Sequence, residues 1–190
     1  LLGVDSAEQM QSKCSGNKEY YAFSKGNALY RLNSEGVLTR IFTYLTEENN
    51  RFRGDFLSHG IRLMDVKDNG DVDFLVYGYI SRGRHEGYTG IVFYTYDNSD
   101  NTVVENFFLP LQENKEELEE SLRSLSYYAG NKMFYLYYGG TVYGIDTNSF
   151  EVLTLASALK EGELSSSEDG QYLAYDEKNG ESELSSTVVL

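Results

Sequence analysis

The chain has 190 residues, of which 41% are hydrophobic, so it is long enough for one domain with a buried core. Its formal net charge of −14 argues against nucleic acid and anionic membrane surfaces as partners, because both carry negative charge. The single cysteine, Cys14, excludes an internal disulfide and a zinc site built from cysteines. No apolar run approaches the ~20 residues of a membrane span, and no signal peptide is recognisable.

The first fourteen residues suggest a short helix. Ser6 and Gln9 have the spacing of a capping box, and Ala7, Met10 and Cys14 then fall on one helical face. We therefore expect Cys14 to be a packed helix residue rather than a nucleophile, since neither histidine is near it in the sequence.

Most of the remaining chain consists of β-prone runs separated by Gly, Asn, Asp and Ser turns. We predict a long surface loop at residues 46–60 and one helix at residues 113–125, in which Leu118, Leu122 and Leu125 share a face. The predicted strands are residues 18–24, 28–32, 37–45, 61–66, 71–80, 88–96, 102–111, 132–138, 141–145, 150–155 and 171–176.

Four similar turns each precede an aromatic-rich strand, at intervals of about 53, 61 and 39 residues. They are Gly16-Asn17, Asn69-Gly70, Gly130-Asn131 and Asp169-Gly170. A period near 40 residues with three or four strands per unit is typical of propeller blades. We therefore predict an all-β fold of β-propeller-like antiparallel repeats, about three and a half blades in a single domain or fragment, with the helix inserted. A β-sandwich is the alternative. The repeats cover about residues 16–46, 61–111, 126–157 and 163–190.

The fourth repeat, LSSSEDGQYLAYDEKNG, resembles the Ser-x-Asp-Gly-x-x-Leu-Ala-Tyr motif of TolB and WD40-like propeller repeats; the matching residues are Ser167, Asp169, Gly170, Leu173 and Tyr175. The resemblance implies that Asp-Gly turns into the inner strands and that the Leu and Tyr side chains fill the space between blades. It also implies a location outside the cytoplasm of a bacterium. Both ends of the chain look cut, so we expect missing sequence, a second copy, or rearrangement into an open sheet to complete it.

The loop at residues 81–87 is the candidate binding site, because it holds a basic cluster in an acidic chain. Arginines grip carboxylates or phosphates through paired hydrogen bonds, and a histidine beside a carboxylate can move protons. Solubilising charges on an exposed hairpin tip are the alternative explanation. The candidate ligand-binding residues are Arg82, Arg84, His85 and Glu86 here, with Arg51 and Arg53 from the predicted loop.

The acidic turn at residues 65–73 resembles a calcium loop, but Lys67 and Val76 occupy positions that need ligands. We interpret it as a turn that enters a blade, and Asp97, Asp100 and Asn101 as a weaker candidate of the same kind. Most tyrosines are expected to pack between blades with their hydroxyl groups at the rim, although they could also stack on sugars or peptides.

No nucleophile elbow, phosphate loop or zinc-protease motif is present, and no catalytic residue, cofactor or metal is predicted. We hypothesise a non-catalytic module that binds a protein, peptide or glycan, with no nucleic-acid partner and no membrane insertion within this segment. The alternatives are a glycan hydrolase or lyase built on a propeller, and a sensor or accessory domain of a membrane-anchored signalling protein.

Overall fold

The computed structural model describes residues 11–43, 56–80, 84–111, 126–128, 132–157, 162–167 and 172–177. The described part of the chain consists of β-strands and turns, and it contains no helix of the length and hydrophobicity that a membrane span requires. The chain divides into two compact units, Leu1–Glu113 and Asn114–Leu190, and each is described by itself. The predicted helix at residues 113–125 lies outside the described residues.

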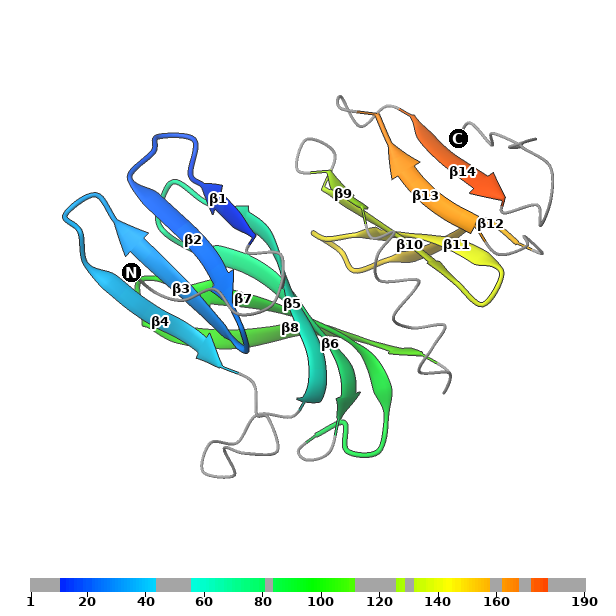
Figure 1. Ribbon diagram of the computed structural model, residues 1–190, viewed down its shortest axis with the longest axis horizontal. Helices are drawn as coiled ribbons and strands as arrows, with labels where there is room; N and C mark the ends of the chain where they lie inside the picture. Colours follow the sequence, from blue (N-terminus) through cyan, green and yellow to red (C-terminus); the bar gives the residue numbers. More distant parts are fainter. Residues whose placement is uncertain are drawn as a thin grey trace. The chain divides into compact units, whose positions relative to one another are not determined.

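The first unit contains two sheets, each made of four consecutive antiparallel strands (Figure 1). Within each sheet the spatial order follows the sequence order, so that every strand pairs with its neighbour along the chain. Blade 1 comprises β1 (Ser12–Cys14), β2 (Tyr20–Lys25), β3 (Ala28–Asn33) and β4 (Leu38–Thr43). Blade 2 comprises β5 (Phe56–Val66), β6 (Val72–Ile80), β7 (Thr89–Asp97) and β8 (Thr102–Leu111).

The two blades pack face to face through alternate side chains, because successive residues of a strand point to opposite faces. Ala22, Leu29 and Ile41 of blade 1 form one buried cluster with the inward side chains of β5, β6 and β7. Phe42 reaches across to Phe74 on β6, with ring centroids 5.0 Å apart. Burial of these apolar side chains is the main force that holds blade 1 on blade 2.

Blade 2 buries apolar side chains on its other face as well. Leu75, Ile91 and Phe93 alternate in sequence with the side chains that face blade 1, and they are at most 2% exposed. A sheet that is apolar on both faces needs a covering layer on each side. This is the pattern of a blade inside a stack rather than of an isolated sheet.

The second unit contains another sheet of four consecutive antiparallel strands, which we call blade 3, and a two-stranded hairpin. Tyr137 and Val142 of blade 3 pack with Leu173 and Tyr175 of the hairpin, and the two tyrosine rings lie 4.9 Å apart. Leu173 and Tyr175 are therefore buried between sheets, as the repeat motif predicted. Blade 3 comprises β9 (Ser126–Tyr128), β10 (Met133–Tyr138), β11 (Thr141–Asp146) and β12 (Val152–Ala156), and the hairpin comprises β13 (Gly162–Ser166) and β14 (Leu173–Glu177).

The turns repeat from blade to blade in their backbone conformation and in their side-chain capping. Lys18, Gly70 and Lys132, which lead into the second strand of each blade, all have positive φ angles between 58° and 88°. The third strand of each blade ends on an Asn or Asp whose side-chain oxygen accepts a backbone N–H from the following turn; these residues are Asn33, Asp97 and Asp146. Such local bonds stabilise tight turns.

The predicted all-β propeller-type fold is confirmed by this succession of four-stranded sheets. In the alternative β-sandwich, strands from distant parts of the sequence share a sheet, whereas here consecutive strands complete one sheet before the next begins. Two of the turns predicted to open a repeat, Gly16-Asn17 and Asn69-Gly70, lie between the first and second strands of blades 1 and 2, so a strand precedes each of them. The other two, Gly130-Asn131 and Asp169-Gly170, lie outside the described residues.

Two local predictions at the first strands of the blades are wrong. Ser12–Cys14 is a strand rather than the end of a helix, because it pairs with residues 21–23 of β2, and Cys14 is exposed rather than packed. Phe56–Gly60, predicted as loop, belongs to β5 and pairs along β6. Both segments owe their conformation to partner strands that lie beyond any local window of sequence.

Candidate functional site

The loop between β6 and β7 is described from Arg84 onward, and we call Arg84–Tyr88 the tip. Backbone hydrogen bonds close it onto the end of β6: Gly87 donates its N–H to Ile80, and Ile80 donates its own to Tyr88, both at 2.8 Å. Gly87 has a φ of 89°, a conformation that a side chain makes costly. The glycine thus allows the loop to fold back and to present its neighbours over β8.

His85 is held between a carboxylate and an aromatic ring. Its Nε2 lies 2.8 Å from Oε1 of Glu105 on β8, and its ring stacks on Phe108 at a centroid distance of 3.9 Å. The side chains of His85 and Glu105 are 17% and 24% exposed. Contact with both groups fixes the orientation of the imidazole before any ligand arrives.

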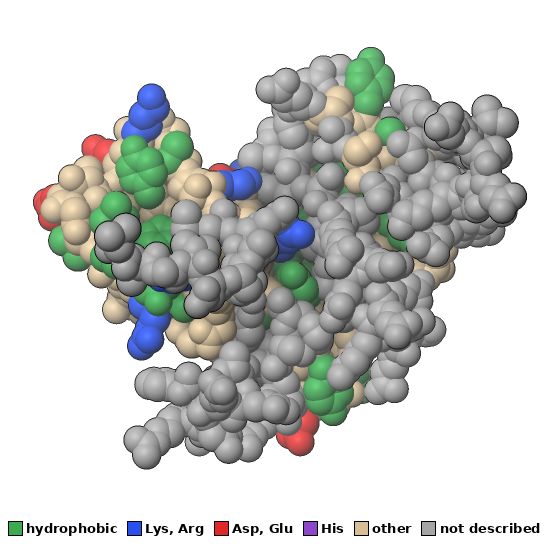
Figure 2. Space-filling view, in the orientation of Figure 1, with side chains coloured by type: hydrophobic (Ala, Val, Ile, Leu, Met, Phe, Trp, Pro, Cys, Tyr) green, Lys and Arg blue, Asp and Glu red, His purple; other side chains and the backbone are tan. Residues whose placement is uncertain are grey.

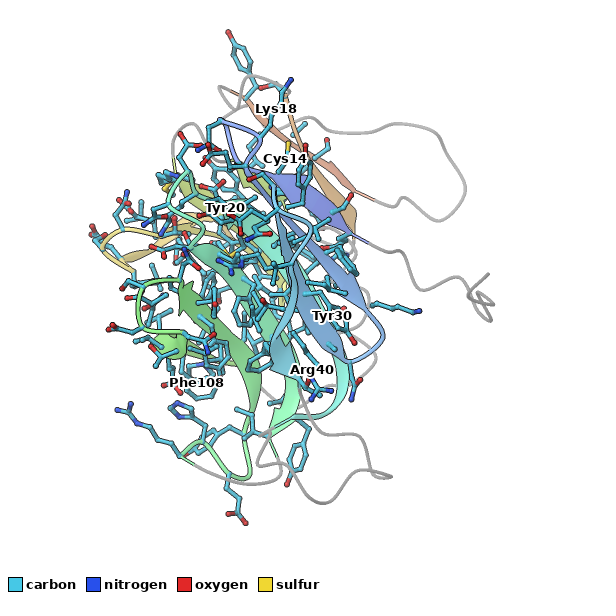
Figure 3. The ribbon with its side chains drawn as sticks, turned by 90° about the vertical axis from the view of Figure 1, so that its left-hand side faces the viewer. Cys14, Lys18, Tyr20, Tyr30, Arg40 and Phe108 are labelled. Atoms are coloured by element: carbon cyan, nitrogen blue, oxygen red, sulfur yellow. The ribbon has the colours of Figure 1, made fainter. Side chains whose placement is uncertain are left out.

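Gly90 makes room for this arrangement. A Cβ atom at Gly90 would lie 2.5 Å from both a ring carbon of Phe108 and the carbonyl oxygen of Leu109. The Phe108 ring therefore packs directly against the β7 backbone at Gly90, and the His85 imidazole stacks on the ring. Figure 3 shows Phe108 at the end of the green sheet.

Two long side chains flank the His85–Glu105 pair and reach into solvent. The Arg84 side chain is 80% exposed, and its Nη1 lies 3.6 Å from Oε1 of Glu105. Tyr88 is 57% exposed and meets the Phe108 ring edge-on at 6.1 Å. The tip therefore offers a guanidinium, an imidazole and a phenol that a ligand can contact together.

The structure brings together part of the predicted site. Arg84, His85 and Glu86 all lie at the tip, and Glu86 is exposed. Arg82, Arg51 and Arg53 lie outside the described residues, so their role stays a prediction. Glu105 and Phe108 were missed because they belong to β8 and no local motif links them to the basic loop, and Tyr88 was missed because it was assigned to the following strand.

The acidic turn at residues 65–73 is hydrogen-bonded both to blade 1 and within blade 2. Asp68 accepts the backbone N–H of Asn17 in blade 1, and Asp71 accepts that of Asn98 in blade 2, each at 2.9 Å. The Asn98 side chain also accepts a hydrogen bond from the guanidinium of Arg31, which is 8% exposed. The interpretation of residues 65–73 as a turn that enters a blade agrees with these bonds. Within the described residues, no three His, Cys, Asp or Glu side chains are placed to hold a metal ion.

Two carboxylates at the ends of third strands have lowered pKa values. The pKa of Asp97 is lowered chiefly by the hydrogen bond from the Ser99 hydroxyl, and also by the backbone N–H groups of Ser99 and Asp100. The pKa of Asp146 is lowered first by the backbone N–H of Asn148. Hydrogen bonds to the ionised form stabilise it relative to the protonated form.

The expectation that tyrosines pack between blades holds for much of the described set. Tyr96, Tyr137 and Tyr138 are buried, and Tyr20 and Tyr94 pack against the core between blades 1 and 2. Tyr21, Tyr88 and Tyr172 are each at least 42% exposed, and Tyr30 lies on the face of blade 1 that points away from blade 2.

The class that these sheets define is the propeller-type fold. No protein-family model matches the chain, and no curated protein sequence matches it. Solved structures similar to it include TolB from Acinetobacter baumannii, with 18% identity over 90% of this chain and 38% of that one and a TM-score of 0.49.

Two further similar structures are enzymes by name. They are an oligogalacturonate lyase from Vibrio parahaemolyticus, with 10% identity over 84% of this chain and 42% of that one and a TM-score of 0.46, and dipeptidyl peptidase 4 from Porphyromonas gingivalis, with 10% identity over 95% of this chain and 28% of that one and a TM-score of 0.45. The chain spans about two fifths or less of each of these three proteins.

Proposed function

We propose that this chain is a propeller-type binding module with no catalytic role of its own. Its ligand is a protein, peptide or glycan that it recognises through the tip. The observation that carries this proposal is the arrangement at the tip, where an exposed arginine and an exposed tyrosine flank a histidine already held in place. Tyrosine and arginine dominate the binding energy of many interfaces, and a fixed side chain loses little entropy on binding.

The chemistry of the tip favours a ligand that accepts hydrogen bonds. The Arg84 guanidinium has five N–H donors and suits a carboxylate, while the Tyr88 ring can stack on a sugar or a peptide side chain. Among the described residues, His85 contacts Glu105 and Phe108, and these two contacts hold its ring in a fixed orientation toward a ligand.

The test is a screen of the purified chain on glycan and peptide arrays, followed by titration of the strongest hit. Tyr88→Ala should weaken binding roughly tenfold or more, the effect of losing one dominant contact. Tyr172→Ala is the matched control, because Tyr172 is 56% exposed against 57% for Tyr88 and lies on the hairpin of the other unit. Equal effects of the two substitutions, or conversion of an arrayed glycan by the chain, would overturn the proposal.

A location outside the cytoplasm is part of the same proposal. It is supported by the resemblance of residues 167–175 to the TolB repeat motif. Reading the open reading frame upstream of Leu1 for an export signal or a membrane anchor tests it, and fractionation of the cells that make the protein gives an independent answer. Recovery of the protein with the cytoplasmic fraction would contradict it.

A further inference from the structure

The face of blade 1 that points away from blade 2 carries large side chains that remain exposed. The ring of Phe23 stacks on that of Tyr30 at 5.3 Å, and Tyr30 pairs across to Arg40 on β4. Figure 3 shows this sheet in blue and labels Cys14, Tyr30 and Arg40, which belong to this face. Tyr21 and Leu38 are 42% and 55% exposed. We call this the open face; its residues are Cys14, Tyr21, Phe23, Lys25, Tyr30, Leu38 and Arg40.

Blade 1 is basic, although the chain is strongly acidic. Its four strands contain no Asp or Glu, and residues 11–43 hold five Lys or Arg against two Glu, a net charge of +3. Since the whole chain carries −14, the rest of it carries −17. Figure 2 shows Lys and Arg side chains beside hydrophobic ones on the described surface of this sheet.

Two of these cations lie on the side of the open face. Register places Arg40 opposite Tyr30, and Lys25 opposite Ala28 at the next position along. The structure records no hydrogen bond or ion pair between either side chain and the other described residues. By contrast, Arg31 on the opposite face lies between the rings of Tyr20 and Tyr96 and donates to an amide. The charges on the open face are therefore available to a partner.

Apolar rings beside cations that pair with no described residue indicate the chemistry of that partner. A contiguous exposed apolar patch on a soluble protein marks an interaction surface, and the sign of its charges selects the complementary sign. A second copy docked through the same face would set the cations of one copy against a face that carries the same cations, and like charges oppose association. An apolar sheet packed on this face would bury the charges of Lys25 and Arg40 without opposite charges, which costs free energy.

We infer that the open face binds an acidic polypeptide segment of another protein. Carboxylates of that segment pair with Lys25 and Arg40, while its apolar side chains cover Tyr21, Leu38 and the stacked rings. This inference is independent of the proposed role of the tip, which lies on the other blade.

The sole cysteine of the chain gives the test a built-in reporter, because Cys14 is exposed at the edge of the open face. The probe is a fluorescein-labelled peptide in which Asp and Glu alternate with Phe and Leu. Matched peptides carry Lys in place of the acids, or Ser in place of Phe and Leu. Fluorescence anisotropy measures affinity, and mass spectrometry measures the rate at which iodoacetamide alkylates Cys14 with and without peptide.

The acidic apolar peptide should bind, bind more weakly as salt rises, and slow the alkylation of Cys14. The double variant K25E/R40E should bind the acidic apolar peptide roughly tenfold or more weakly, because two exposed ion pairs are lost and repulsion is added. Lys18→Glu, which changes the charge at the turn beside β2 with no residue of the open face altered, should have a clearly smaller effect than Arg40→Glu. Far-UV circular dichroism checks that each variant is folded.

Four results would each overturn the inference. They are failure of the acidic apolar peptide to bind, equal binding of the Lys-containing peptide, binding that leaves Cys14 alkylation unchanged, and equal effects of the Lys18 and Arg40 reversals. If the full-length polypeptide from which the chain comes already protects Cys14 without peptide, its own further sequence covers the face and the inference is wrong. Loss of binding on Tyr88→Ala alone would place the peptide at the tip instead.

Discussion

The packing of blade 1 on blade 2 can be measured through one pair of rings, Phe42 and Phe74. Phe74 is fully buried on β6, and the Phe42 ring from β4 lies 5.0 Å from it at an interplanar angle of 56°. Replacing Phe74 by Leu removes ring contacts and leaves a partly filled cavity, so we expect a loss of about 1–2 kcal/mol in the free energy of unfolding. The contact itself should be worth about 0.5–1.5 kcal/mol beyond burial.

A double-mutant cycle isolates that contact. The substitutions Phe42→Leu and Phe74→Leu, alone and together, should give a coupling of about 0.5–1.5 kcal/mol. The control cycle pairs Phe42→Leu with Phe93→Leu, because Phe93 is also buried in blade 2 but lies on its opposite face. This second coupling should be close to zero, since residues without shared contacts act additively.

Urea unfolding followed by far-UV circular dichroism gives the four free energies in each cycle. The chain has no tryptophan, and its 17 tyrosines provide an intrinsic fluorescence signal as a second probe. Equal coupling in the two cycles would refute the face-to-face packing of blades 1 and 2. Coupling confined to the Phe42–Phe74 cycle would support the blade assignment in solution.

Three further predictions concern the second unit, the tip and the turns. Tyr175→Ala should lower the free energy of unfolding by about 3–5 kcal/mol because the ring is 2% exposed, while Tyr172→Ala at 56% exposed should change it by less than about 0.5 kcal/mol; urea titration of both checks this. Gly90→Ala should cost about 1–3 kcal/mol by the same assay, since the new methyl would meet the backbone and an aromatic ring of β8 at 2.5 Å. The lowered pKa of Asp97 implies stability that is fully present above its ordinary value of 3.8 and lost as the pH falls through the folded-state pKa. As the pH is lowered below 5, the free energy of unfolding of the wild-type chain should therefore fall by more than that of the Asp97→Asn variant. Parallel curves of unfolding free energy against pH for the two proteins would contradict the hydrogen bonds from Ser99 as the cause.

The turns were predictable because their chemistry is local. Gly26, Gly70 and Gly87 have positive φ angles, and glycine adopts these at little cost. Asn33 and Asp97 cap turns within a few residues of themselves. Signals of this kind lie inside a short stretch of sequence, so they marked most hairpins and hence most strand boundaries.

The first strands of blades 1 and 2 could not be predicted in the same way. Ser12–Cys14 has three exposed side chains and no apolar alternation, so its extended backbone is set by pairing with β2 and not by its own composition. The spacing of Met10 and Cys14 fits a helix equally well. Tertiary pairing overrides such weak local preference.

The candidate site could also be predicted only where its residues are neighbours in the sequence. The sequence places Glu86 next to His85, yet the carboxylate that contacts the imidazole belongs to Glu105, twenty residues away on β8. The hairpin turn between β7 and β8 brings these residues together, and a bulge between Phe93 and Tyr94 shifts the register on the way. The irregularity of that register is not visible in residue types, so neither Glu105 nor Phe108 could be assigned to the site from the sequence.

The strictly sequential pairing of strands bears on how the chain is made. Every hairpin joins neighbours, so the strands of a blade need nothing from later sequence to find their partners. Short closing loops form quickly and lose little entropy. During synthesis on the ribosome, blade 1 can fold while blade 2 is still being translated. The four strands of blade 2 can then pack against the inward apolar side chains of blade 1 as they emerge.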